Sequence, residues 1–432
     1  METLNYLEHI QRIAFSEEDE DDLRDELFDR IQKIDYKKII KEEPFFAKSL
    51  LHLNYLPETD AEIEKIIEDH LKKEREFIYD VPTRFENAYH YSIIKNHLNN
   101  IQKAIEDLDY SIQQKITIGT VPSGNIDAQA ILMGESAESE ILIIIESGVF
   151  SFANQFSKIV ARCLSTSGTT QIGQTIAFKP EEYKQNIKNL PDIPHKFRRL
   201  LDAIVFTGTA DNTPLDLIHD EATADLAAML RDYMELFMLA HEYAHVILGH
   251  LNWKKKRNLC LLGKASTVDI LDRSWMEEFE ADDLAMRLVL HIGVQKRVNP
   301  TIVFWGIELF FSCIKMIDMA VCFNEGLEYN TFYGPNESHP LPQIRLGYLQ
   351  HRLVKERLDD AYHPVLDDSF VSNIIDIIWD QSLNHYGMAI GLRSKLSIRW
   401  RHKTKLSHQR KRKYIGFQPF DINEWLIKNG RA

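Results

Sequence analysis

Two histidines four residues apart, with a glutamate beside the first, are the clearest chemical feature of the sequence. They are His241, Glu242 and His245, in the segment HEYAH. Because residues four apart share one face of a helix, both imidazoles can reach a single zinc ion. Glu242 can then act as a general base on a water molecule held by the metal. The spacing therefore predicts a zinc centre.

The residues around this motif indicate a helix that is buried on most sides. The apolar residues beside it are Leu236, Phe237, Leu239, Ala240, Ala244, Ile247 and Leu248. A surface helix with two solvated histidines would not need so broad an apolar surface. Buried histidines and glutamates need partners, because unpaired polar groups cost free energy in an apolar environment. A bound metal ion would supply one.

A catalytic zinc ion takes three protein ligands and leaves one position for water. A third histidine six residues after the second is excluded, because that position holds Leu251. A later segment expected to be helical carries Glu278 and Asp282, which share one face of that helix. Glu280 lies about 200° around the helix from Glu278, so both cannot point at one metal ion.

These motifs together resemble those of the HtpX- and BepA-type gluzincin metallopeptidases. The helix with the two histidines is followed by an E-x-E-A-D stretch, here EFEAD at 278–282. A second matching element, T/S-H-P-x-x-x-x-R, is present as SHPLPQIR at 338–345. The resemblance covers about residues 116–350 and implies a zincin-like core.

The resemblance also implies roles for individual residues. Glu278 would be the third zinc ligand, and Asp282 would orient a ligand histidine. His339 would approach the metal as a switchable fourth ligand or stabilise the oxyanion, and Arg345 would help to order the site. The short spacer before Glu278 and the Gly-His pair after the first helix are closer to the ImmA/IrrE regulatory metallopeptidases. Phage-exclusion proteases of the Lit type are another cytoplasmic family to consider, so the subfamily stays open.

The activity that these residues predict is zinc-dependent endopeptidase chemistry on a protein or peptide substrate. Glu242 would take a proton from the zinc-activated water and pass it to the leaving amine. Segment 128–133 or 141–147 would pair with the substrate backbone as a sheet edge. Stress response or phage defence is the expected setting. The alternative is a regulatory protein that binds nucleic acid or another partner and has a structural or vestigial zinc site.

Apolar periodicity predicts a mostly helical α+β fold with one small sheet. Helix is expected over most of residues 1–115, including 88–114, and again after the sheet; the segment 180–210 gives no clear pattern. The expected strands are 117–121, 128–133 and 141–147, and the later helices are 150–164, 223–252 and 274–292. The expected domains are a helical N-terminal domain (1–115), a metallopeptidase domain (116–360) and a C-terminal helical and basic segment (361–432).

Composition indicates a cytoplasmic protein without a membrane span. The N-terminus lacks the basic and then apolar order of a secretory signal, and the four cysteines show no paired spacing. The most apolar stretch, 301–323, contains Glu308, Lys315 and Asp318. These three charges fall on one side of a helix, which predicts a helix that packs in a protein core.

Charge is distributed unevenly along the chain. The formal net charge is −14, yet ten Lys or Arg and no Asp or Glu lie between Gln381 and Phe420. The basic segment 393–413 is therefore a candidate site for nucleic acid or for an acidic partner. The chain's own acidic body is an alternative partner for it.

Overall fold

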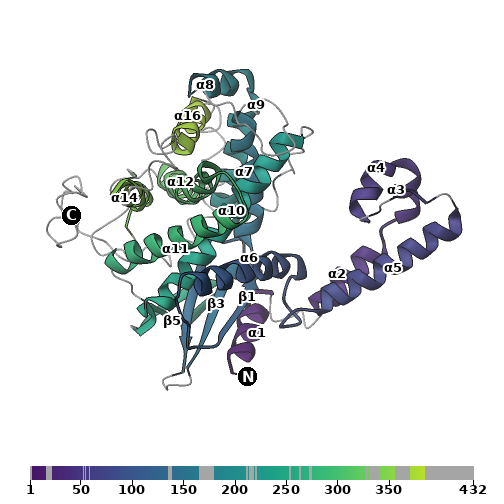
Figure 1. The fold of residues 1–432 in the computed structure, drawn as a ribbon, viewed down its shortest axis with the longest axis horizontal. Helices are drawn as coiled ribbons and strands as arrows, with labels where there is room; N and C mark the ends of the chain where they lie inside the picture. The colour runs from purple at the N-terminus through teal and green to yellow at the C-terminus, as the bar shows by residue number, and fades with distance from the viewer. Residues whose placement is uncertain are drawn as a thin grey trace.

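In the computed structural model, helices form most of the described chain and two small sheets complete it (Figure 1), so the predicted α+β class is confirmed. The structure describes residues 2–15, 22–51, 53, 55–57, 59–134, 139–164, 180–210, 213, 218, 221–252, 254–261, 264–271, 275–325, 329, 340–355 and 370–384.

The larger sheet has three strands in the order β1-β3-β2. They are β1 (Ile116–Val121), β2 (Ala128–Met133) and β3 (Glu140–Glu146). β1 runs parallel to β3, and β2 runs antiparallel to it. The three predicted strands are confirmed, with bounds that shift by at most one residue. Because β3 has a neighbour on each side, β1 and β2 are the edges of this sheet in the described part of the chain.

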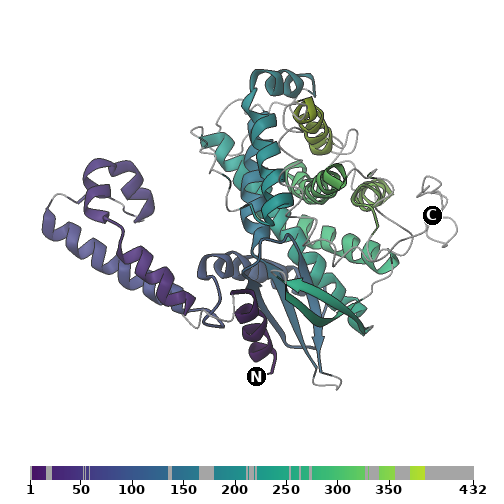
Figure 2. The ribbon, with the colours of Figure 1, turned by 180° about the vertical axis from the view of Figure 1, so that it is seen from behind.

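Helices cover both faces of the sheet. Leu142 and Ile144 of β3 pack with residues of α1 (Glu2–Phe15), whereas Ile143 and its alternate neighbours face the main core. α6 (Ala88–Asp107) lies on that second face, opposite α1 (Figures 1 and 2). Burial on both faces explains why β3 is a continuous apolar run instead of an alternating one.

The helix with the two histidines, α10 (Glu221–Ile247), lies at the centre of the helical layer. It packs against α11 (Trp275–Gln295), α12 (Pro300–Glu325) and strand β2. α12 approaches α10 closely at Gly306, where an added Cβ would lie 2.4 Å from the Cβ of Tyr233. A glycine is therefore needed at this crossing, and it fixes how near the two helices pack.

A second apolar cluster lies on the side of α12 away from the sheet. The helices that build it with α10 and α12 are α7 (Gly148–Cys163), α8 (Pro180–Asn189), α9 (Asp192–Thr207) and α16 (Phe370–Asn384). The segment that gave no clear sequence pattern, 180–210, therefore contains two helices. Proline begins α8 and α12, as expected for a residue whose missing N–H would have no partner in a first helical turn.

The polar stripe of α12 faces α16. The backbone N–H of Ser372 donates to Glu308 Oε1 at 2.9 Å, and Lys315 Nζ lies 2.6 Å from Asp376 Oδ1. The prediction of a helix that packs in a protein core is confirmed. Among the described helices, none has the length and apolar character needed to cross a membrane.

Four helices form an arm that extends from the sheet (Figures 1 and 2). They are α2 (Leu23–Gln32), α3 (Tyr36–Glu42), α4 (Pro44–Leu50) and α5 (Asp60–Tyr79). The arm has an apolar cluster of its own, which includes Tyr36, Ile40 and Ile63. α1 and α6 also belong to the predicted N-terminal domain, yet they pack on the sheet. A separate unit over residues 1–115 stays a prediction.

Two helices end earlier than predicted, and both differences have a backbone cause. α6 ends at Asp107 instead of 114, and Asp109 just beyond it has φ +58°. α10 ends at Ile247 instead of 252, because Gly249 adopts φ +72° and turns the chain. The elements that follow are a short 3-10 turn, η1 (His250–Asn252), and an unpredicted hairpin of β4 (Lys254–Leu261) and β5 (Lys264–Leu271).

Candidate metal centre

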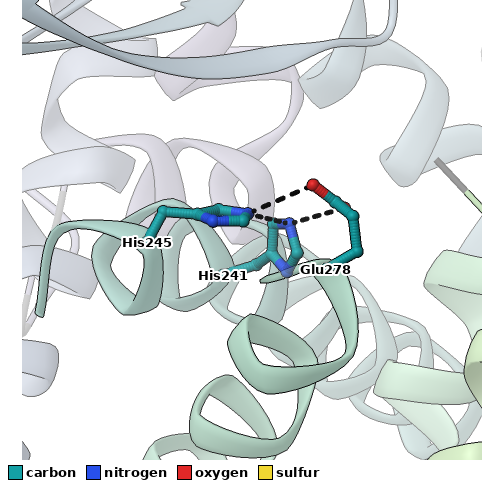
Figure 3. A group of neighbouring side chains, drawn as sticks. All are labelled: His241, His245 and Glu278. Carbon is teal, nitrogen blue, oxygen red and sulfur yellow. Dashed lines mark hydrogen bonds and ion pairs between the residues drawn. The ribbon is translucent and has the colours of Figure 1, made fainter. Parts of the chain in front are cut away.

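Three side chains from two helices converge at the centre of the molecule. His241 and His245 come from α10, and Glu278 comes from the first turn of α11 (Figure 3). The two Nε2 atoms lie 3.0 Å apart. Glu278 Oε2 lies 3.5 Å from His241 Nε2, and Glu278 Oε1 lies 3.4 Å from His245 Nε2. All three side chains are buried.

These distances and atom types fit a metal ion. Ligand atoms about 2.0–2.2 Å from a tetrahedral zinc ion lie about 3.3–3.5 Å from one another. The three separations at this site, between 3.0 and 3.5 Å, are close to those values. Two imidazole nitrogens and one carboxylate oxygen also form a donor set that suits zinc. His241, His245 and Glu278 could therefore hold a metal ion.

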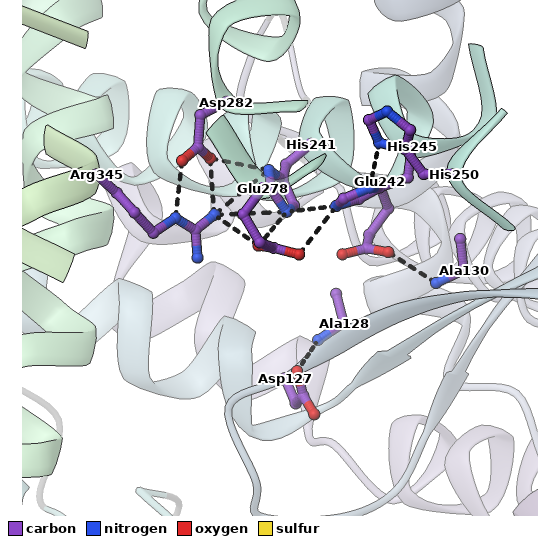
Figure 4. A network of polar contacts seen from close by, with 10 residues as sticks. All are labelled: Asp127, Ala128, Ala130, His241, Glu242, His245, His250, Glu278, Asp282 and Arg345. Atoms are coloured by element: carbon purple, nitrogen blue, oxygen red, sulfur yellow. Dashed lines mark hydrogen bonds and ion pairs between the residues drawn. The ribbon is translucent and has the colours of Figure 1, made fainter. Parts of the chain in front are cut away.

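Asp282 and Arg345 lie beside His241. Asp282 Oδ1 is 2.9 Å from His241 Nδ1, so the opposite ring nitrogen, Nε2, points toward Glu278 (Figure 4). Arg345, from α14 (Pro342–Lys355), donates two hydrogen bonds of 2.7 Å to the Asp282 carboxylate. The structure thus places both predicted supporting residues next to the ligands.

The charged groups of this buried cluster shift one another's pKa. Burial alone would raise the pKa of Asp282, but Arg345 and His241 hold that pKa below its ordinary value. Burial would lower the pKa of His241, yet its hydrogen bonds to Asp282 and Glu278 outweigh this effect and raise it to about 9. The carboxylates of Asp282 and Glu278 therefore favour a positive charge at this position.

A different partner supports His245, and it was missed by the sequence analysis. His245 Nδ1 lies 3.0 Å from His250 Nδ1, and His250 Nε2 lies 3.4 Å from Glu280 Oε2. Glu280 therefore contacts His250 and does not belong to the group of metal-ligating side chains, as its position on the helix predicts. The sequence signal for His250 was Gly249, whose left-handed backbone ends α10 and turns the chain back.

Glu242 lies between the ligands and the edge of the sheet. Its Oε2 accepts a hydrogen bond of 2.7 Å from the backbone N–H of Ala130 in β2 (Figure 4). Of the two segments predicted to pair with a substrate, 128–133 is an edge strand. The other, 141–147, is excluded for this role, because β3 lies in the middle of the sheet.

A cavity of about 240 Å³ opens beside these residues. His241, Glu242 and Arg345 line one side of it. Its remaining walls are mainly apolar and include Val149, Met234, Met238, Phe310, Ile314 and Pro340. The site therefore combines a ligand cluster, a carboxylate and an apolar recess.

Two predicted features lie outside the described residues. They are His339 and the basic segment 393–413. Pro340, the neighbour of His339, is buried and lines the cavity. The roles predicted for His339 and for the basic segment stay predictions.

Comparison with known proteins identifies no relative of the chain, so the candidate metal centre rests on its own geometry. No family model, no curated protein and no solved structure matches the chain. The resemblance to gluzincin metallopeptidases therefore remains one of motifs.

Proposed function

We propose that the chain is a zinc-dependent endopeptidase of the gluzincin type. The observation that supports this most strongly is the position of Glu242. Its carboxylate lies between a buried group of three metal-ligating side chains and the edge strand β2, at one cavity. A purely structural metal site needs neither a carboxylate that is not a ligand nor an adjoining recess.

Each residue of the site has its own role in peptide hydrolysis. His241, His245 and Glu278 would hold zinc, which when bound lowers the pKa of water and polarises a carbonyl group. Glu242 accepts the proton of the attacking water and delivers it to the leaving amine. Asp282 keeps His241 oriented. In this proposal His339 stabilises the oxyanion or provides a fourth ligand.

Strand β2 gives the substrate a backbone to pair with. The N–H groups of Ala128 and Ala130 both donate to carboxylates, those of Asp127 and Glu242, instead of to β3. An extended peptide at this edge can take over such donors, and backbone pairing tolerates varied side chains. The apolar recess beside Glu242 would receive an apolar side chain near the scissile bond.

The test is zinc content and hydrolysis of an unfolded protein and a peptide library, measured on the same preparations. Glu242→Gln should keep zinc at wild-type stoichiometry and lose hydrolysis by about 10²–10⁴-fold, the usual share of a general base. Glu277→Gln, an identical change next to a ligand on α11, should behave as wild type. Glu278→Ala should lose zinc.

Two results would overturn the proposal. One is hydrolysis at the wild-type rate by Glu242→Gln. The other is a wild-type protein that holds zinc and cleaves none of the substrates, which would favour the regulatory alternative. For a role in phage defence, expression should be toxic to the host with wild type and harmless with Glu242→Gln.

A further inference from the structure

The two ligand histidines are held from behind by different chemistry. Asp282 faces Nδ1 of His241, which is a familiar arrangement of carboxylate and ligand imidazole. Nδ1 of His245 instead faces another imidazole, that of His250, at 3.0 Å. Only 8% of His250 is exposed.

If His245 binds a metal ion, the positions of the protons on the two rings follow from this geometry. His245 directs Nε2 toward Glu278. To bind a metal, this Nε2 atom must carry a lone pair, and the proton of the neutral His245 ring then resides on Nδ1. His250 Nδ1 must then accept this hydrogen bond through its own lone pair. The proton of the neutral His250 ring is left on Nε2, which lies 3.4 Å from the Glu280 carboxylate.

We infer that His250 is a positioning residue that fixes the tautomer and orientation of His245, and that Glu280 fixes those of His250. The inference relies on the metal centre of the proposed function but not on its peptidase activity. The turn at Gly249 makes the contact possible, because its φ of +72° brings a residue beyond the helix end under His245.

A second cavity, beside His250, offers a control. His250 and Glu280 line a recess of about 460 Å³, which has a different lining from the recess beside Glu242. His351 also lines it. His351 therefore shares the surroundings of His250 without its contact with a ligand histidine.

The experiment measures zinc affinity of the full chain by competition with a fluorescent chelator. His250→Phe keeps a ring but loses the acceptor, and it should lower the affinity by about 10–100-fold, as loss of such a partner does at other zinc sites. His250→Asn, whose amide oxygen can occupy the position of Nδ1, should restore most of the affinity. Glu280→Gln, at the outer end, should cause a smaller loss.

Controls separate this effect from a general loss of structure. His351→Phe should bind zinc as wild type does, and the metal-free variants should melt at similar temperatures. Unchanged affinity in both His250→Phe and Glu280→Gln would overturn the inference, as would an equal loss in His351→Phe. If affinity falls as expected but no substrate is cleaved, the inference stands and the peptidase proposal fails. If wild type binds no zinc, both fail.

Discussion

At the scale of single residues, Asp282 has the most demanding position. It is fully buried and serves two partners, accepting from Arg345 and facing His241. A buried ion pair gains little net free energy when intact, since desolvation opposes the attraction between the charges. Removal of one partner is costly, because the other charge stays buried and uncompensated. Arg345 is the group left behind, with an ion pair of 3.4 Å to Glu278 in place of its two hydrogen bonds of 2.7 Å to Asp282.

The first prediction concerns this pair. Asp282→Asn keeps the shape of the side chain but removes its charge, so the free energy of unfolding of the metal-free protein should fall by about 3 kcal/mol. Urea denaturation measures the change. Asp283→Asn is the matched control, because Asp283 pairs with Arg287 and Arg352 nearer the surface. There the loss should be about 1 kcal/mol. Equal losses of unfolding free energy in the two variants would show that burial does not determine the cost of removing the carboxylate.

At the scale of elements, the end of α10 is as important as its middle. The helical repeat brings His241 and His245 to one face, but no helix brings His250 to the same place. Gly249 does so by a left-handed turn. An added Cβ at Gly249 would meet no other atom, so the demand for glycine there is one of backbone conformation alone.

Two glycine substitutions should therefore change the free energy of unfolding in opposite directions. Gly249→Ala should lower the free energy of unfolding by about 1 kcal/mol, the cost of a left-handed conformation for an L-residue. Gly347→Ala, within α14 and also without neighbours for its Cβ, should raise it by about 0.5–1 kcal/mol, since alanine favours helix. Chemical denaturation of both variants compares them. A stabilised Gly249→Ala protein would contradict this account of the turn.

The sequence predicted those features of the structure that are determined by a few neighbouring residues. The ligand spacing on α10, the shared helix face of Glu278 and Asp282, and the three strands follow from short periodic patterns, and the structure has them where expected. The choice of Glu278 as a ligand came from the resemblance of the motifs. The end of α10 and the contact with His250 depend on one backbone angle, which no periodicity encodes. Selection of β2 over β3 as an edge strand needed the strand order of the described sheet. Strand order is a property of the whole sheet.

At the scale of the whole molecule, buried carboxyl groups far from the metal centre connect helices and strands that are distant in the sequence. Glu86 accepts hydrogen bonds from Gln11 of α1 and from the backbone of Thr120 in β1. Glu308 connects α12 to the N-terminus of α16 through Ser372. Burial raises the pKa of each of these two glutamates to about 7. These contacts therefore link stability to pH.

Glu308 gives the sharper test of that link. Its pKa is raised from 4.5 to about 7 by burial, so between these pH values the folded protein keeps a proton that the unfolded chain releases. Stability contributed by this group therefore falls as pH rises from 4.5 to 7, by on the order of 3 kcal/mol. Glu308→Gln should flatten the profile, equalling wild type near pH 4.5 and exceeding it near pH 8. Glu76→Gln, an exposed change, serves as the control in urea denaturation across this range. A Glu308→Gln profile as steep as that of wild type would mean that Glu308 ionises as readily in the folded protein as in the unfolded chain.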